Sequence, residues 1–166
     1  MNRRLLYKKA YRILKDSTPL KFDCGLLCGA KCCSGESDAG MCLFPGEEIL
    51  LEKHGGFLSI RNEKMADTDV LFAVCSRTCD RRYRPLACRI FPYAPYLDGD
   101  GRLSVIEDPR ARYLCPLLNK LPEIRMDRLF RRNVRSVFQL LIQDDEIKDF
   151  VHLLSDVLDE YKRFVG

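Results

Sequence analysis

The chain has 166 residues, of which 46% are hydrophobic and 31% are charged, and its formal net charge is +4. This composition is typical of a globular domain, and no apolar run approaches the length of a membrane-spanning helix. Charged residues interrupt the basic N-terminus before an apolar stretch can form, which argues against a signal peptide, so we expect a cytoplasmic protein without a membrane partner.

The first predicted element is an amphipathic helix over residues 2–16. Ser17-Thr18-Pro19 is expected to end it, because proline disfavours helical backbone at the residue before it. Apolar side chains recur at spacings of three and four, as expected for one buried face. The residues of this stripe are Leu6, Ala10, Ile13 and Leu14, with Tyr7 and Tyr11 beside it.

A segment rich in glycine and cysteine follows, and its residues 24–33 contain four of the nine cysteines. These are Cys24, Cys28, Cys32 and Cys33. Thiolates are soft ligands, and four of them in so short a span can surround one metal ion or one edge of an iron–sulfur cluster. In a reducing compartment such clustering favours metal or redox chemistry over disulfides. The alternative is a set of buried free thiols.

Short strands and one short helix are predicted next. The helix is expected to begin at Pro45-Gly46-Glu47-Glu48 and to stop after His54, at Gly55-Gly56. A single strand precedes it and two hairpins follow, the second around Asp98-Gly99-Asp100-Gly101. The predicted strands cover residues 41–44, 57–60, 70–74, 91–97 and 102–106.

From Met126 onward the pattern indicates two amphipathic helices, with a break near Asp144-Asp145. Packing against the rest of the domain is the first interpretation of their apolar faces, and a dimer contact is the alternative. The predicted fold is therefore α+β, with a small cysteine-rich, metal-centred core, short antiparallel hairpins, an N-terminal helix and a C-terminal helical pair. We divide the chain into an N-terminal helix (1–21), a cysteine-cluster domain (22–116) and a C-terminal helical segment (117–166).

Four more cysteines are candidate ligands because they come from separate later segments. They are Cys75, Cys79, Cys88 and Cys115, whereas Cys42 lies in an apolar strand and is assigned to the core. Structural zinc commonly uses pairs of closely spaced cysteines from two segments. Cys24 and Cys28 together with Cys79 and Cys88 fit that scheme, although other pairings fit as well.

These motifs resemble the YkgJ-type cysteine-cluster family, described as a zinc- or iron-chelating domain with a Cys-x2-Cys-x2-Cys-Cys signature. The matching parts are the cysteine run that ends in Cys32-Cys33, the stretch Leu43-Phe-Pro-Gly-Glu-Glu48, and Arg84-Pro85-x2-Cys88-Arg89-x-Phe91-Pro92. The first two gaps of the cysteine run are three residues long here, which departs from the signature. The resemblance covers roughly residues 22–116 and implies chelation of zinc or iron without naming a reaction.

We expect a metal-binding protein in which the cysteines ligate zinc, with an iron–sulfur cluster of redox or enzymatic role as the alternative. Cys24, Cys28, Cys32, Cys79 and Cys88 are the first choices, followed by Cys33, Cys75 and Cys115. Arg84 and Arg89 are expected to offset the negative charge of the thiolates from just outside the ligands, rather than to hold an anionic substrate.

Partners other than the metal ion are less defined. The first 21 residues and the segment 75–93 are basic, and the chain after Gln143 is acidic. We interpret this asymmetry as contact between the two parts within one molecule. A zinc-scaffolded module that binds a protein or nucleic acid is a further alternative, with nucleic acid the less favoured partner. No histidine array or paired-thiol motif indicates a catalytic centre, so whether the chain is an enzyme stays open.

Overall fold

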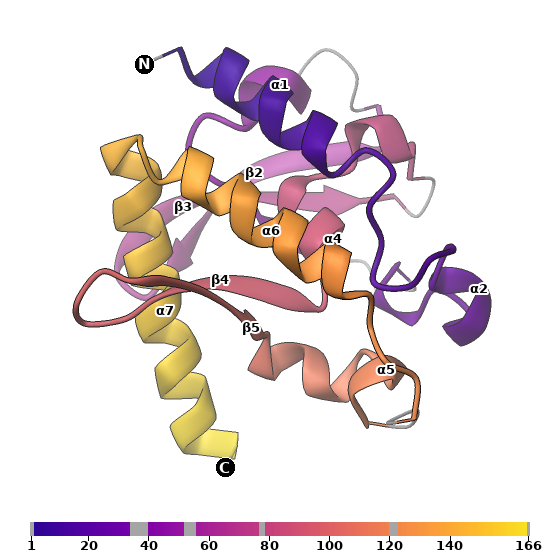
Figure 1. Cartoon of the computed structure of the whole chain (residues 1–166). Helices are drawn as coiled ribbons and strands as arrows, with labels where there is room; N and C mark the ends of the chain where they lie inside the picture. Colours follow the sequence, from indigo (N-terminus) through magenta and orange to yellow (C-terminus); the bar gives the residue numbers. More distant parts are fainter. Residues whose placement is uncertain (1, 34–39, 52–55, 77–78, 120–122, 166) are drawn as a thin grey trace.

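The protein, seen in a computed structural model, is an α+β fold in which helices pack with two small antiparallel sheets (Figure 1). The structure describes residues 2–33, 40–51, 56–76, 79–119 and 123–165. The α+β architecture confirms the predicted fold class. The predicted helix stop at His54-Gly55 lies outside the described residues. No helix in the described part of the chain combines the length and the apolar character needed to cross a membrane.

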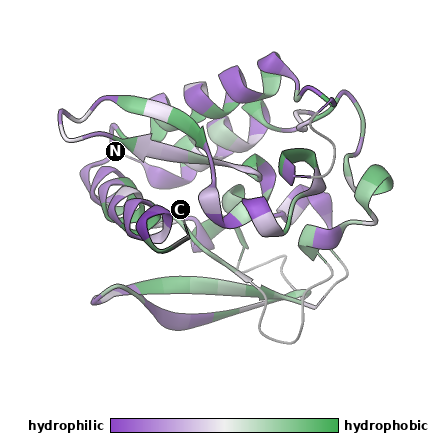
Figure 2. Cartoon of the chain, turned by 90° about the horizontal axis from the view of Figure 1, so that it is seen from below, coloured by the Kyte–Doolittle hydropathy of each residue, from purple (hydrophilic) through white to green (hydrophobic). Residues whose placement is uncertain are grey.

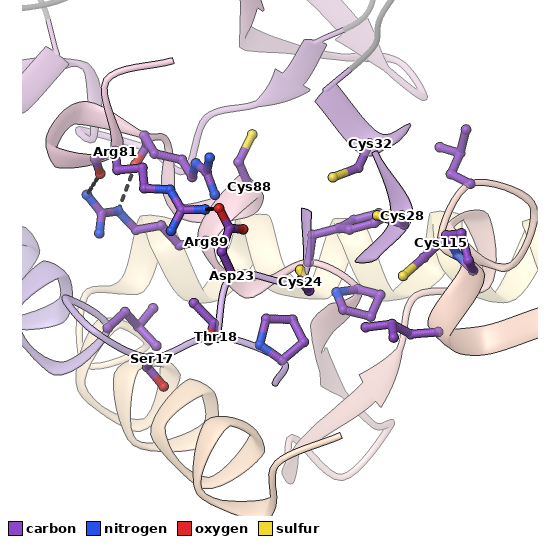
Figure 3. A pocket seen from close by; sticks show the side chains of 18 residues that line it. Ser17, Thr18, Asp23, Cys24, Cys28, Cys32, Arg81, Cys88, Arg89 and Cys115 are labelled. Carbon is purple, nitrogen blue, oxygen red and sulfur yellow. Dashed lines mark hydrogen bonds and ion pairs between the residues drawn. The ribbon is translucent and has the colours of Figure 1, made fainter. Parts of the chain in front are cut away.

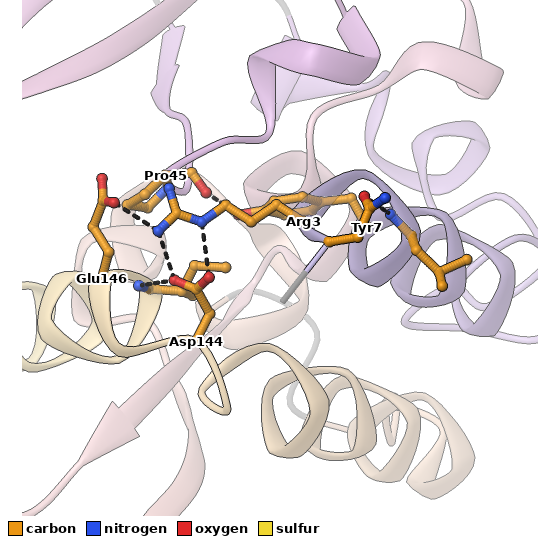
Figure 4. Close-up of polar contacts among 8 residues, drawn as sticks. Arg3, Tyr7, Pro45, Asp144 and Glu146 are labelled. Carbon is orange, nitrogen blue, oxygen red and sulfur yellow. Dashed lines mark hydrogen bonds and ion pairs between the residues drawn. The ribbon is translucent and has the colours of Figure 1, made fainter.

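Helix α1 spans Arg3–Ile13 and confirms the predicted N-terminal helix. The side chain of Asn2 accepts a hydrogen bond from the backbone nitrogen of Leu5, which caps the first turn. Leu6, Tyr7 and Ala10 are buried, as the apolar stripe predicts. The hydroxyl of Tyr7 donates to the carbonyl oxygen of Pro45 at 2.8 Å, so α1 is fixed to the loop that follows the first strand (Figure 4).

The C-terminal helices are α6 (Arg128–Leu141) and α7 (Asp145–Val165), and the break between them lies where it is predicted. Their apolar faces form much of the main core. Phe138 is fully buried, and its ring centroid lies 5.1 Å from that of Phe44. At the start of α7, Asp144 forms a bidentate ion pair with Arg3, which joins this helix to α1 (Figure 4). Packing within the chain thus uses both faces that the sequence predicts to be buried.

The three-stranded sheet has the order β1-β3-β2 and is antiparallel throughout. Its strands are β1 (Gly40–Cys42), β2 (Leu58–Met65) and β3 (Thr68–Cys75), with the short helix α3 (Glu48–Leu51) before β2. The prediction of a hairpin is correct, but its long polar turn is wrong. Polar residues 61–64 and 68–69 pair as strand because exposed cross-strand neighbours such as Lys64 and Asp69 are oppositely charged and directly opposed.

The second hairpin, β4 (Tyr93–Leu97) with β5 (Leu103–Glu107), agrees with the prediction and lies on the opposite side of the molecule from β2 and β3 (Figure 2). It packs on α6 and α7, where the hydroxyl of Ser155 accepts a hydrogen bond from the backbone nitrogen of Leu97. Residues of all three predicted segments therefore share one main core, which α1, β4, β5, α6 and α7 build together with buried residues of β2, β3 and α4.

The remaining elements are short, and several lie at one end of the molecule, where α2 and α5 are seen in Figure 1. They contain the candidate ligands Cys28, Cys32, Cys33 and Cys88, and Cys24 and Cys115 lie directly beside them. A small cluster of buried residues, separate from the main core, lies here: Leu20, Ala111, Cys115 and Leu117. The short elements are α2 (Gly25–Cys28), the 3-10 helix η1 (Lys31–Cys33), η2 (Arg81–Tyr83), α4 (Leu86–Ile90), η3 (Pro109–Tyr113) and α5 (Pro116–Asn119).

Candidate metal centre

The first cysteine run folds as two single turns that reverse direction between them. The carboxylate of Asp23 accepts a hydrogen bond from the backbone nitrogen of Gly25 at 3.0 Å, and α2 starts there. Gly29 ends α2 with a φ of 64°, in the left-handed region that glycine adopts without steric cost. The chain then turns into η1. As a result Cys24, Cys28 and Cys32 face one cavity, although they do not share one continuous helix.

Two later segments bring the other cysteines to the same cavity. Cys88 lies in α4, which begins directly after Pro85, and Cys115 lies between η3 and α5. The cavity has a volume of about 80 Å³ and is lined by five cysteines: Cys24, Cys28, Cys32, Cys88 and Cys115 (Figure 3). We call this cavity the thiol pocket. Three of these five residues come from positions 24–32, whereas Cys88 and Cys115 come from two later segments, so the fold, and not local spacing, assembles the set.

Cys33 and Cys79 do not line the thiol pocket but lie close to it, on the side of Arg84. The sulfur of Cys33 is 4.0 Å from that of Cys32. The Nε of Arg84 donates to the sulfur of Cys79 at 3.4 Å, and the positive charge of Arg84 also acts on Cys33 and Cys88. Arg84 thus places a positive charge beside the thiols.

Cys75 and Cys42 lie elsewhere. Cys75 is the last residue of β3, where it pairs with Leu58, and it is not among the residues that line the thiol pocket. Cys42 lies in β1 and packs against the main core, which agrees with its assignment as a core residue. Of the eight candidate ligands, the structure therefore brings five to one cavity and two to its edge, and it leaves Cys75 apart.

The surroundings of the pocket oppose the charging of most of its thiols. Burial raises the pKa of Cys24, Cys88 and Cys115, and for Cys88 the pKa rises to about 12. Repulsion by neighbouring thiolates adds to this, since Cys28 raises the pKa of both Cys24 and Cys115. Cys33, at the edge of the pocket, differs from these thiols because its pKa is lowered. Its hydrogen bond with Cys32, followed by the charges of Arg84 and Arg81, lowers its pKa.

Arg89 has a different role from the one expected. Its guanidinium donates to backbone carbonyl oxygens, from Nε to Arg84 and from Nη2 to Arg81 and Arg82, at 2.8 to 3.0 Å. Its other face lies over the ring of Tyr11, 4.3 Å from the centroid. Although Arg89 lines the thiol pocket, these contacts make it an anchor for the loop 81–84 rather than a counter-charge to the cysteines.

Glu47 lies in the stretch where the sequence predicts a helix start, and the sequence pattern gives it no further role. It is fully buried, and its carboxylate accepts hydrogen bonds from three segments. Oε1 accepts from the hydroxyl of Tyr11 and from the backbone nitrogen of Leu86, and Oε2 accepts from the backbone nitrogen of Phe44. Burial raises the pKa of Glu47, and these hydrogen bonds oppose that change. The available signal was an acidic residue within the apolar stretch Leu43–Leu51.

The donor set fits a soft metal ion in its chemistry, because five thiols from distant segments share one small cavity. The cysteine side chains are not, however, arranged as a complete metal site. Within the described residues, no three Cys, His, Asp or Glu side chains are grouped closely enough to hold a metal ion. Metal binding is coupled to folding of the ligand segments, so ligation here would involve rotation of the cysteine side chains and adjustment of the single turns α2 and η1.

Comparison with known proteins adds no relative. The chain has no match among protein-family models, curated proteins or solved structures. The resemblance to the YkgJ-type family therefore stays a prediction that rests on the motifs of the chain itself.

Proposed function

We propose that this protein binds a transition-metal ion through cysteine thiolates of the thiol pocket, and that zinc is the ion. The observation that carries the proposal is the convergence of Cys24, Cys28, Cys32, Cys88 and Cys115 on one cavity of about 80 Å³. Such a small cavity is of a size for an ion rather than for an organic cofactor, which needs several hundred cubic ångströms.

Four thiolates suit tetrahedral zinc, and the pocket offers one more than that number. Ligands from the run 24–32, from α4 and from the segment before α5 would join parts of the chain that are distant in sequence. A bound ion would therefore act as a crosslink at the end of the molecule where the elements are single turns. Arg84 would offset the negative charge that four thiolates leave on a divalent centre.

An iron–sulfur cluster is the second candidate. Iron–sulfur clusters are also held by four cysteine thiolates, and the fifth cysteine of the pocket, together with Cys33 at its edge, supplies spare ligands for such a cluster. A redox or enzymatic role would follow from this candidate, whereas zinc would make the site structural. Thiol ligation is common to both.

The decisive measurement is elemental analysis combined with an absorption spectrum, on protein purified without oxygen and without a metal-binding tag. Stoichiometric zinc in a colourless sample supports the proposal. Iron with acid-labile sulfide, and visible absorption that is bleached on reduction, replaces zinc by the second candidate. Protein that contains neither metal, and that does not take up zinc when it is added to the reduced chain, contradicts both.

A further inference from the structure

We infer that Glu47 is a positioning residue for the thiol pocket: its carboxylate fixes the start of α4 and thereby places Cys88. The inference rests on the proposed function only in naming what the pocket binds. Among the described residues Glu47 forms no hydrogen bond with a cysteine, and its hydrogen bonds toward the pocket run through the backbone of α4 and through Tyr11.

The geometry of this contact is specific. The backbone nitrogen of Leu86 is the first free donor of α4, because Pro85 before it has no N–H, and it donates to Oε1 of Glu47 at 2.6 Å. Cys88 follows two residues later in the same helix. A five-residue helix has almost no stability of its own, so its position depends on anchors. Burial of Leu86 and Ile90 in the main core is one anchor, and the hydrogen bond to Glu47 fixes how the first turn is oriented on that core.

A second route leads from Glu47 to the loop that carries Arg84. Tyr11 donates to Glu47 at 2.6 Å, and Arg89 lies over the ring of Tyr11 while it donates to the carbonyl oxygens of Arg81, Arg82 and Arg84. One buried carboxylate thus connects α1, α4 and the loop 81–84. The turn that presents Glu47 needs Gly46, whose φ is 83° and whose added Cβ would meet the side chain of Arg3 at 2.8 Å.

The substitution Glu47→Gln tests this role because it keeps the shape of the side chain. All three protein groups that contact the carboxylate are hydrogen-bond donors. An amide has one acceptor oxygen and one NH₂ group, so its NH₂ must face the N–H of either Phe44 or Leu86. A buried donor that faces a donor is destabilising, and α4 is expected to shift or loosen. The matched control is Glu48→Gln, since Glu48 is the next residue and no described group is bonded to its buried Oε2.

Alkylation of the reduced, metal-free protein by iodoacetamide gives the first readout, with the labelling rates of Cys88 and Cys115 compared by mass spectrometry. Cys115 lines the same pocket but is carried by another segment, so it reports general opening of the structure. In Glu47→Gln we expect the ratio of Cys88 to Cys115 labelling to change severalfold, and in Glu48→Gln we expect no change. An unchanged ratio in Glu47→Gln, or an equal change in both variants, overturns the inference.

Cobalt titration gives the second readout. We expect Glu47→Gln to weaken cobalt binding by about tenfold, the lower end of the effect of groups that orient metal ligands, and to alter the visible spectrum of the bound ion. Wild-type affinity and spectrum in a folded Glu47→Gln variant overturn the inference while the proposed function stands. If the wild type binds no cobalt, the proposed function fails, and the labelling ratio still decides the role of Glu47.

If Glu47→Gln does not fold, Tyr11→Phe replaces it as the test, because this variant keeps the hydrogen bond between Glu47 and Leu86. It is expected to show the same changes in labelling ratio and cobalt binding, but smaller ones.

Discussion

The molecule has two ends that are stabilised in different ways. The main core is built from long elements, such as α6 with 14 residues and α7 with 21 residues, whose apolar faces contribute to one buried cluster and pack on β4 and β5. The end with the thiol pocket is built from single turns of three to five residues, α2, η1, η2, η3 and α5, around a much smaller buried cluster. The short helix α4 joins this end to the main core, because its Leu86 and Ile90 are buried there.

This difference suggests what the cysteines are for. Turns of that length do not persist by hydrogen bonding alone, and a small cluster of apolar residues contributes little burial. A bound metal ion that crosslinks the segments at this end would supply the stability that apolar packing supplies in the main core. The comparison therefore predicts that stability at the core end does not depend on metal and that order at the pocket end does.

The largest effect is expected from a core substitution. Phe138→Ala removes a fully buried ring that contacts Phe44, and we expect a loss of about 3–5 kcal/mol in the free energy of unfolding. Urea denaturation with zinc and with a chelator should give the same loss. Leu129→Ala, on an exposed position of the same helix, is the control and should change stability by less than about 0.5 kcal/mol. A loss that depends on zinc would show that the two ends are not independent.

The next largest effect is expected at the pocket. Cys88→Ser removes a thiol of the thiol pocket, so zinc content and zinc-dependent stability should fall together. At zinc concentrations about 100 times the Kd, the wild type gains about 2.7 kcal/mol, and the variant should lose most of this gain. Thermal unfolding with and without chelator measures this zinc-dependent gain in stability.

Cys75→Ser is the matched control for that variant, because Cys75 ends β3 and does not line the pocket. It should keep full zinc content. Equal metal loss in both variants would contradict the ligand set proposed for the pocket, and full occupancy in Cys88→Ser would remove Cys88 from it.

The elements of the core end could be predicted because each carries its own periodic signal. Spacings of three and four in residues 126–161 are enough to predict two helices, and Phe130, Val134 and Val137 are buried as expected. The hairpin β2–β3 shows the limit of this approach. Its polar residues 61–64 contain no strand signal of their own, and they are ordered by pairing with β3, which local sequence does not report.

The pocket end could be predicted in composition but not in arrangement. The clustering of cysteines identifies Cys24, Cys28 and Cys32, yet nothing in their spacing says that Cys115 joins them while Cys75 does not. That distinction depends on where β3 ends and where η3 turns back. Glu47 was missed for the same reason, because its three hydrogen-bond partners come from α1, α4 and its own loop.

A smaller effect is expected from the ion pair between Arg3 and Asp144, which belongs to the core end. The hydrogen bond from Arg3 holds the pKa of Asp144 below its ordinary value. A carboxyl whose pKa is lowered by folding stabilises the protein above its unfolded pKa of about 3.9, and this contribution is lost as the pH falls through the folded pKa. Asp144→Asn, which can still cap α7, should cost about 1 kcal/mol at pH 7. Urea melts from pH 7 to pH 2.5 should show the two proteins converging at the acidic limit, and zinc affinity at pH 7 should be unchanged.

The smallest effect is expected at the tip of the β2–β3 hairpin, where Lys64 and Asp69 form an exposed ion pair at 2.8 Å. Asp69→Asn should change the free energy of unfolding by less than about 0.5 kcal/mol, since exposed pairs contribute little. The variant also tests whether the β2–β3 hairpin is coupled to the thiol pocket, because β3 runs from this ion pair to Cys75. If the hairpin belongs with the core end, Asp69→Asn leaves zinc affinity unchanged. A clear drop in zinc affinity would mean that β3 transmits its position to the pocket, and Cys75 would then have to be reconsidered as a ligand.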